Sequence, residues 1–222
     1  MYRTLNSLKP LAVAITIAAG ATLVGSQVRA APLETTVVAG GCFWCVEADF
    51  EHVKGVTDVV SGYAGGKAAN PTYKEVSRGG TGHLEVVEIT YDPDVISYPQ
   101  ILHLFLRSID PLDGGGQFCD RGAVYAPALF PATAGEKRAA TAALQTAASD
   151  LGVDKVEVAV LPAAPFYPAE DYHQDYYKKD DLVLTRFGPV SKAAAYKKYR
   201  DGCGRDQRIK ALWGDAAPFA GL

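Results

Sequence analysis

The chain has 222 residues, of which 48% are hydrophobic and 21% charged, and its formal net charge is −3. This composition is typical of a globular protein long enough to bury one core. Four cysteines are too few for a disulfide scaffold of this length. No Lys/Arg cluster follows the first thirty residues, so nucleic acid and anionic membrane surfaces are not expected partners.

The N-terminus has the pattern of a secretory signal peptide. Residues 1–9 carry Arg3 and Lys9 without an acid, residues 10–25 are apolar, and Ala30 closes a stretch with small residues. We expect cleavage after Ala30 and export to the periplasm or the medium. The apolar stretch is short for a bilayer span, so an uncleaved membrane anchor is the weaker alternative. Without this segment the chain has 19 basic and 25 acidic residues, a formal charge of −6.

The first expected elements surround a cysteine. The β-branched run 35–39 predicts a buried strand, and apolar residues spaced three and four apart predict a helix over 42–53. Gly40 and Gly41 permit a sharp turn between them. Cys42 then lies at the first turn of the helix, where the positive dipole end is expected to lower the pKa of the thiol and favour a nucleophilic thiolate. The plain alternative is a small buried residue.

The remaining elements predict one α+β domain over residues 31–222. Their order resembles a ferredoxin-like split β-α-β unit, a sandwich with helices on the sheet. A long irregular C-terminal tail is expected from about residue 180. The expected elements are a strand at 57–61, a loop at 63–73, a strand at 83–91, a helix at 98–107, a loop at 110–125, a helix at 133–151, a strand at 155–161 and short helices near 170–178 and 189–199.

Glu85 is a candidate general acid. The alternation in 83–91 places it on the same face as Val87 and Ile89, toward the core. A carboxyl in apolar surroundings has a raised pKa and can stay protonated. The alternative is a solvent-facing glutamate on a half-exposed strand.

Three loop residues can add to such a site. Tyr73 and Tyr125 lie in glycine-rich loops and can donate hydrogen bonds to a substrate oxygen. Asp120 lies in another loop segment. Their alternative roles are packing for the tyrosines and turn formation for the aspartate.

The other three cysteines have different expected roles. Cys45 follows Cys42 at the spacing of a CxxC disulfide, or packs inward. Cys119 is expected to be buried and inert. Cys203 lies between two glycines and is therefore expected to be the most mobile of the four cysteines. The four histidines are scattered and only one CxxC is present, so no metal site and no cofactor are expected.

At this point the sequence resembles the class A peptide methionine sulfoxide reductases. The resemblance runs in the order of that family from residue 36 to about 178. The matching segments are Gly41-Cys42-Phe43-Trp44, Gly62-Tyr63-Ala64-Gly65-Gly66, Asn70-Pro71-Thr72-Tyr73, Thr81-Gly82-His83-Leu84-Glu85, Tyr91-Asp92-Pro93, Asp110-Pro111 and Ala169-Glu170-Asp171-Tyr172-His173-Gln174.

The resemblance implies an enzyme that reduces the S epimer of methionine sulfoxide, free or in peptides, and an α+β sandwich around a mixed sheet. Cys42 matches the nucleophile that becomes a sulfenic acid, and Glu85 matches the acid that protonates the sulfoxide oxygen. Further matches are Tyr73 and Tyr125 to the phenols that hold this oxygen, Asp120 to the nearby carboxylate, and Phe43 and Trp44 to the pocket for the methyl group.

Two cysteines are candidates for the second thiol. The family typically resolves the sulfenic acid with a cysteine in a glycine-flanked tail, which Cys203 matches, and Cys45 is the alternative. Cys45 and Cys119 stand where the family usually has other residues. A thioredoxin-like reductant is the implied partner, and a monomer is the default. The rival functions are a thiol–disulfide oxidoreductase built on Cys42 and Cys45, and a non-catalytic binding module.

Overall fold

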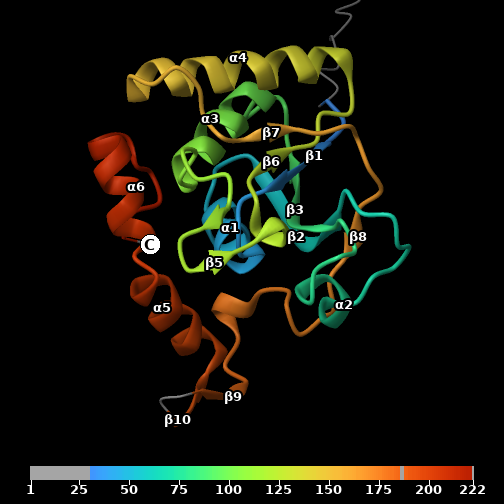
Figure 1. Ribbon diagram of the computed structural model, residues 1–222, viewed down its shortest axis with the longest axis vertical. Helices are drawn as coiled ribbons and strands as arrows, with labels where there is room; N and C mark the ends of the chain where they lie inside the picture. Colours follow the sequence, from blue (N-terminus) through green and yellow to red (C-terminus); the bar gives the residue numbers. More distant parts are fainter. Residues whose placement is uncertain (1–30, 186–187, 222) are drawn as a thin grey trace, which may run out of the picture. The chain divides into compact units, whose positions relative to one another are not determined.

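The structure is a computed structural model that describes residues 31–185 and 188–221. The signal peptide expected over residues 1–30 lies outside the described residues. A six-stranded sheet in the order β7-β6-β1-β3-β2-β8 forms the centre (Figure 1). Its strands are β1 (Glu34–Ala39), β2 (Val56–Ala64), β3 (Leu84–Tyr91), β6 (Ala128–Leu129), β7 (Ala159–Val160) and β8 (Tyr167–Pro168).

The sheet is mixed, because β6 and β7 are parallel and the other neighbours are antiparallel. The central strand β3 pairs Val87 with Val38 of β1 and Glu85 with Tyr63 of β2. Apolar side chains on both faces of β3 are buried, which is typical of a strand covered on each side.

Helices pack around this sheet. They are α1 (Phe43–Phe50), α2 (Tyr73–Ser77), α3 (Tyr98–Ser108), α4 (Ala134–Leu151), α5 (Lys192–Gly202) and α6 (Arg205–Trp213), with 3-10 turns η1 (Ala123–Tyr125), η2 (Tyr176–Lys178) and η3 (Gly214–Ala216). Two small hairpins complete the fold, β4 (Gly116–Gln117) with β5 (Asp120–Arg121), and β9 (Leu182–Thr185) with β10 (Gly188–Ser191). Within residues 31–185 and 188–221, no helix has both the length and the apolar character that crossing a bilayer requires.

Local sequence explains the ends of the long helices. Ser97 and Gln100 form a reciprocal capping box at the start of α3. Thr133 caps α4, and Gly152 ends it in the left-handed conformation. The apolar stripe of α3, which includes Ile101 and Phe105, is fully buried.

The α+β class with a mixed sheet is confirmed, and several boundaries differ from the prediction. Strand β2 continues to Ala64, because it pairs with β3 as far as Leu84 and with β8 at Gly62 and Tyr63. The strand expected over 155–161 is regular only at Ala159–Val160.

The C-terminal part is more regular than the expected irregular tail. It contains α5, which overlaps the helix expected near 189–199, and α6, which was not expected; both are drawn in red tones in Figure 1. The helix expected near 170–178 is only the 3-10 turn η2. The side chains of Arg200 and Arg205 are 3% and 2% exposed and fasten these helices to the core. Long-range contacts of this kind leave no local pattern in a sequence, so the docking of these helices on the core could not be predicted.

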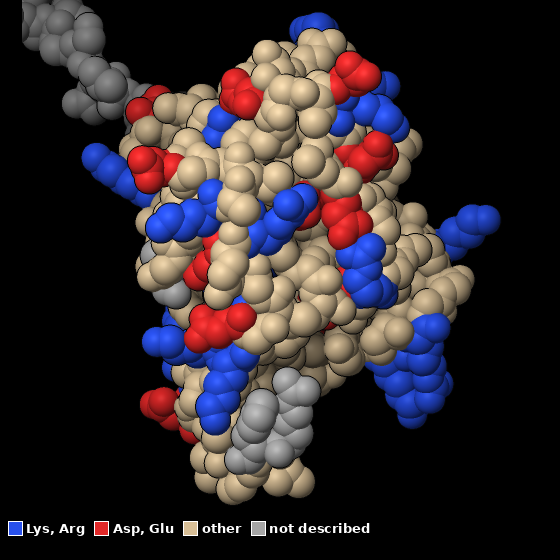
Figure 2. Space-filling model, turned by 60° about the vertical axis from the view of Figure 1, so that its left-hand side comes forward, with Lys and Arg blue, Asp and Glu red and all other residues tan. Residues whose placement is uncertain are grey.

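On the face shown in Figure 2, acidic and basic side chains are intermingled over the upper and central part, and basic side chains stand alone at the lower right. Such mixing is typical of an ordinary solvated surface rather than of a nucleic-acid footprint.

Candidate active site

The turn between β1 and α1 places Cys42 at the N-cap of the helix. Gly41 has φ +81°, and a Cβ there would lie 2.4 Å from Cβ of Gln117. A Cβ on Gly40 would lie 2.8 Å from Val46. Both positions therefore require glycine, one for conformation and one for space. The turn fixes the Cys42 sulfur in a site where the residue is only 7% exposed.

A cavity of about 150 Å³ opens in front of this sulfur. All seven residues that the sequence placed in the catalytic and substrate sites line it, together with one that the sequence analysis did not select, Tyr199. The lining residues are Cys42, Phe43, Trp44, Tyr73, Glu85, Asp120, Tyr125 and Tyr199. Elements far apart in the chain thus bring one sulfur, two carboxyl groups and three phenols together.

Glu85 has the environment that the strand pattern predicted. The residue is 2% exposed, and burial raises the pKa of its carboxyl to about 8. The Phe43 backbone N–H donates a hydrogen bond to this carboxyl at 3.2 Å, which opposes the shift, while the negative charge of Asp120 adds to it. Glu85 is therefore protonated at neutral pH and can donate a proton into the cavity.

The phenols of Tyr73 and Tyr125 lie at the ends of two short helical elements. Thr72 and Glu75 form a capping box that begins α2 at Tyr73, and Tyr125 ends η1. Burial raises the pKa of Tyr73 to about 12 and that of Tyr125 further still. Both hydroxyl groups stay protonated and can donate hydrogen bonds to an oxygen in the cavity.

Aromatic rings form the apolar wall of the cavity. Trp44 stacks on Tyr176 with ring centroids 3.8 Å apart, and its Nε1–H donates to Nδ1 of His173 at 3.1 Å. The ring of Phe43 lies 5.0 Å from the ring of His173. Burial lowers the pKa of His173 to about 4, so this imidazole is neutral and accepts the indole hydrogen bond.

The Cys42 pKa differs from the prediction. The Cys42 thiol donates a hydrogen bond to the Cys45 sulfur, and this bond, burial and the nearby negative charges raise the pKa of Cys42. The same hydrogen bond, together with Arg205 and Arg200, lowers the pKa of Cys45. The expectation that the helix N-terminus lowers the pKa of Cys42 was wrong, because the hydrogen bond to a second sulfur and the burial of the thiol outweigh the helix dipole.

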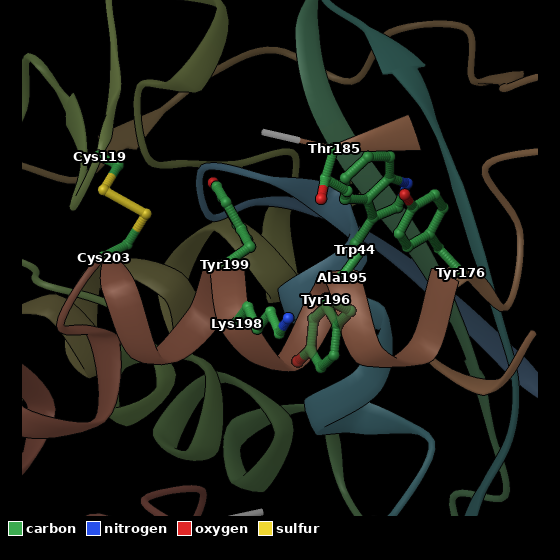
Figure 3. A pocket seen from close by; sticks show the side chains of 9 residues that line it. All are labelled: Trp44, Cys119, Tyr176, Thr185, Ala195, Tyr196, Lys198, Tyr199 and Cys203. Atoms are coloured by element: carbon green, nitrogen blue, oxygen red, sulfur yellow. A yellow bond between two sulfur atoms is a disulfide. The ribbon is translucent and has the colours of Figure 1, made fainter. Parts of the chain in front are cut away.

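Cys119 and Cys203 form a disulfide between the β4–β5 turn and the end of α5. The prediction of a buried, inert Cys119 was wrong, since this residue is exposed and bonded. Cys203 is not on a free tail, because Gly204 leads directly into α6. The disulfide lines one end of a groove of about 410 Å³ that also contains Trp44 and Tyr199 (Figure 3).

An acidic cluster lies beside the site. Carboxylate oxygens of Glu47, Glu51 and Asp175 lie within 4.8 Å of one another. Protein donors already occupy them, because Glu47 accepts from the Ser61 hydroxyl and Glu51 pairs with Lys178. We therefore assign these carboxylates to the attachment of α1 rather than to a metal.

Three residues around the cavity were not predicted from the sequence as site residues: Tyr199, His173 and Tyr176. His173 stood within a matching segment, which was a usable signal. Tyr199 precedes Cys203 by four residues, so a helix through both places them on one face, and this spacing could have linked them.

Comparisons with known proteins agree with this geometry. The family model described as peptide methionine sulfoxide reductase matches residues 34–203. The chain belongs to the peptide methionine sulfoxide reductase family. It is 44% identical over 194 residues to "Peptide methionine sulfoxide reductase MsrA 2" of Rhizobium meliloti, covering 87% of this chain and 90% of that protein. It is also 44% identical to the MsrA protein of Bacillus subtilis, over 82% of this chain and 96% of that one.

Solved structures of this reductase family share the fold. The reduced form of Mxr1 from Saccharomyces cerevisiae superposes with a TM-score of 0.61 at 27% identity, covering 68% of this chain and 88% of that one. Methionine sulfoxide reductase A of Corynebacterium diphtheriae gives a TM-score of 0.59 at 30% identity, covering 69% and 78%. The family match ends at Cys203, so α6 and the docked C-terminus lie beyond it.

Proposed function

We propose that this chain reduces methionine sulfoxide, free or within peptides, to methionine. The observation that carries the proposal is the single cavity that holds the Cys42 sulfur, the protonated Glu85 carboxyl and the hydroxyl groups of Tyr73 and Tyr125. A sulfoxide has an electrophilic sulfur and a basic oxygen. Its reduction needs a soft nucleophile for the sulfur and proton donors for the oxygen.

The first step forms a sulfenic acid. The Cys42 sulfur attacks the sulfoxide sulfur as its own proton passes to Cys45, which takes part as the thiolate that its lowered pKa favours and becomes a thiol. Glu85 gives its proton to the sulfoxide oxygen, while the two phenols hold this oxygen. The oxygen moves to Cys42 as S–OH, the sulfur–oxygen bond of the substrate breaks, and methionine leaves as a thioether. Cys42 is oxidised by two electrons and the substrate is reduced by two.

The second step uses Cys45, which the sequence analysis held as the alternative to Cys203. The Cys45 thiol attacks the Cys42 sulfenic sulfur, forms a disulfide and releases the oxygen as water, with the proton taken from Cys45 completing it. Contact between the two sulfurs supports Cys45, whereas Cys203 is bonded to Cys119. A thioredoxin-like dithiol protein then reduces the Cys42–Cys45 disulfide.

Selectivity comes from the aromatic wall. Phe43 and Trp44 offer an apolar surface for the substrate methyl group, and the stacking of Trp44 on Tyr176 keeps this surface rigid. A methyl group on one side and oxygen donors on the other distinguish the two sulfur epimers. We propose the S epimer, as the family resemblance implies.

The test is turnover of synthetic peptides that carry S- or R-methionine sulfoxide, with dithiothreitol as reductant. We expect methionine from the S peptide alone and none from the Cys42→Ser variant. Activity on the R peptide alone, or activity that persists without the Cys42 sulfur, contradicts the proposal.

The contact between Cys42 and Cys45 also suits a general thiol–disulfide oxidoreductase. This second function predicts reduction of insulin disulfides that is lost on Cys45→Ser, without turnover of sulfoxides. The paired assay therefore separates the two functions.

We also propose that the protein acts outside the cytoplasm, supported by the basic start, apolar stretch and small-residue site of residues 1–30. N-terminal sequencing of the protein from a periplasmic fraction is expected to begin after Ala30. A full-length N-terminus in the cytosolic fraction contradicts export.

A further inference from the structure

The β4–β5 turn, which carries Asp120 into the cavity, is fastened to the C-terminal helices at three successive residues. The Phe118 ring lies under the guanidinium of Arg205, with Cζ 4.7 Å from the ring centroid. Cys119 forms the disulfide with Cys203, and Asp120 accepts a hydrogen bond from the Tyr199 hydroxyl. No other part of the cavity wall has this covalent attachment within the part of the chain that the structure describes.

The two central attachments reinforce each other. Asp120 adjoins Cys119 on the turn, and Tyr199 lies one helical turn before Cys203 on α5. The Cα atoms of the bonded cysteines are 5.1 Å apart. A disulfide at this place keeps the turn and the end of α5 together, so the hydrogen bond beside it forms with little further loss of conformational freedom.

Tyr199 is the residue through which this attachment reaches the reaction site. It lines both the cavity of Cys42 and the open groove, and Figure 3 shows its ring between the disulfide and Trp44. It also packs on the cluster that contains Cys42 and Cys45. Movement of α5 away from the turn therefore opens the wall of the cavity beside the nucleophile.

The same geometry argues against an exchange between Cys203 and Cys42. Arg205 follows two residues after Cys203 and is held by the carbonyls of Ser108 and Gly40 at 3.2 and 3.4 Å. Arg200 precedes it by three residues and pairs with the buried Asp49 at 2.7 Å. Cys203 thus lies between two buried anchors, and Tyr199 lines both the groove that contains Cys203 and the cavity that contains Cys42.

We propose that the Cys119–Cys203 disulfide is a clasp that positions Tyr199 and Asp120 over the substrate cavity, separate from the thiols that react. The clasp remains oxidised during turnover, and Tyr199 is a positioning residue of the cavity wall. This inference deepens the proposed function and rests on it for its kinetic test. A second readout below does not depend on activity.

The kinetic test is a single turnover on the S-sulfoxide peptide by enzyme whose Cys42 is reduced, without added reductant. The variants are Cys119→Ser, the double variant Cys119→Ser/Cys203→Ser, and Tyr199→Phe. We expect the half-saturating peptide concentration to rise roughly tenfold in each, because a small misplacement of a binding group costs one to two orders of magnitude. Tyr199→Phe added to the double cysteine variant is expected to have little further effect, because both changes remove the same attachment of Asp120 to α5.

Partial unfolding would lower the amplitude of the turnover without moving the half-saturating concentration. Tyr91→Phe is the matched control. It also removes a tyrosine hydrogen bond to a carboxylate, here to Glu34 at 2.8 Å, but at the far end of β3 from Glu85. This control is expected to keep the wild-type half-saturating concentration.

The second readout is the rate at which iodoacetamide alkylates Cys42, followed by mass spectrometry of its peptide. We expect alkylation to be about tenfold faster in the cysteine variants and in Tyr199→Phe, because the Tyr199 side chain then moves away and exposes the Cys42 sulfur. Wild-type concentration dependence together with wild-type alkylation in the cysteine variants overturns the proposal. The proposal is also overturned if the cysteine variants are impaired only in their reduction by a dithiol protein. Cys119 and Cys203 would then transfer electrons to the Cys42–Cys45 disulfide. If the wild type lacks sulfoxide turnover, the proposed function fails. The alkylation rates alone then test whether the disulfide positions Tyr199 over Cys42.

Discussion

The two pairs of cysteines lie in regions built in different ways. Cys42 and Cys45 lie at the start of α1, buried, unbonded and in mutual contact, under a carboxyl and two phenols. Cys119 and Cys203 join a surface turn to the end of α5, and Cys119 is exposed. The first region depends on a tight turn after a strand, and the second depends on contacts between distant segments.

The difference shows that the residues that react and the residues that hold the cavity wall in place belong to separate regions of the chain. In the first region, burial and neighbouring charges set which groups hold protons. In the second, a disulfide and buried arginines hold the wall of the cavity in place. Variants in the first region are therefore expected to change chemistry with little effect on stability, and variants in the second to change stability or substrate binding.

The largest effect is expected from Cys42→Ser. Removal of the nucleophile is expected to lower turnover by about four orders of magnitude or more, as for other nucleophilic residues. The rate of methionine release by chromatography measures this. Unchanged urea unfolding would show that the first region lost chemistry alone, and residual activity above one hundredth of wild type contradicts the assignment.

Glu85→Gln comes next, with a loss of about a hundredfold, because proton transfer by a positioned acid contributes at least this much. Wild-type activity is expected to fall as the pH rises through about 8, where Glu85 loses its proton, and the variant is expected to lack this decline. Glu88→Gln, on the same strand, is the matched control and is expected to keep both the rate and the decline. The pH profile of single-turnover rates checks the prediction.

In the second region, Arg200→Met is expected to lower the free energy of unfolding by about 3 kcal/mol, because it leaves the buried Asp49 with only the more distant guanidinium of Arg205, at 3.9 Å. Burial already raises the pKa of Asp49 to about 6 despite Arg200. Asp49 is neutral in acid and must be buried as a charge at higher pH, so the loss is expected to be larger at pH 8 than at pH 5.

Urea unfolding at both pH values measures this loss. Arg208→Met is the control, because Arg208 pairs with Asp110 while half exposed and its loss is expected to cost less than about 1 kcal/mol. Equal losses for the two arginines would show that the buried anchor has no special role.

The smallest effect is expected from Tyr125→Phe, about tenfold in the single-turnover rate, the value of one hydrogen bond to the sulfoxide oxygen. Tyr73→Phe is expected to act similarly, and together they are expected to exceed either alone. Tyr98→Phe also removes a buried hydroxyl, on α3 away from the cavity, and serves as control. A rate equal to wild type in the Tyr73/Tyr125 double variant would remove both phenols from the mechanism.

The sequence predicted the first region well, because its determinants are local or periodic. The strand before Cys42, the two glycines and the inward face of Glu85 can be read from neighbouring residues. The family resemblance assigned roles to the loop candidates Tyr73, Tyr125 and Asp120, and all three line the cavity.

The second region could not be predicted in the same way. The Cys119–Cys203 bond spans 84 residues, and Arg200 reaches Asp49 across 151. Neither pairing leaves a pattern within a window of the sequence. The raised pKa of Cys42 was also missed, because it depends on which charges the fold brings to the sulfur.

The most direct test maps the disulfides after one turnover. Enzyme with Cys42 and Cys45 reduced receives excess S-sulfoxide peptide without a reductant, is then alkylated, and its peptides are identified by mass spectrometry. We expect one methionine per enzyme, a new Cys42–Cys45 disulfide and an intact Cys119–Cys203 disulfide. A Cys42–Cys203 disulfide with Cys119 alkylated would contradict it.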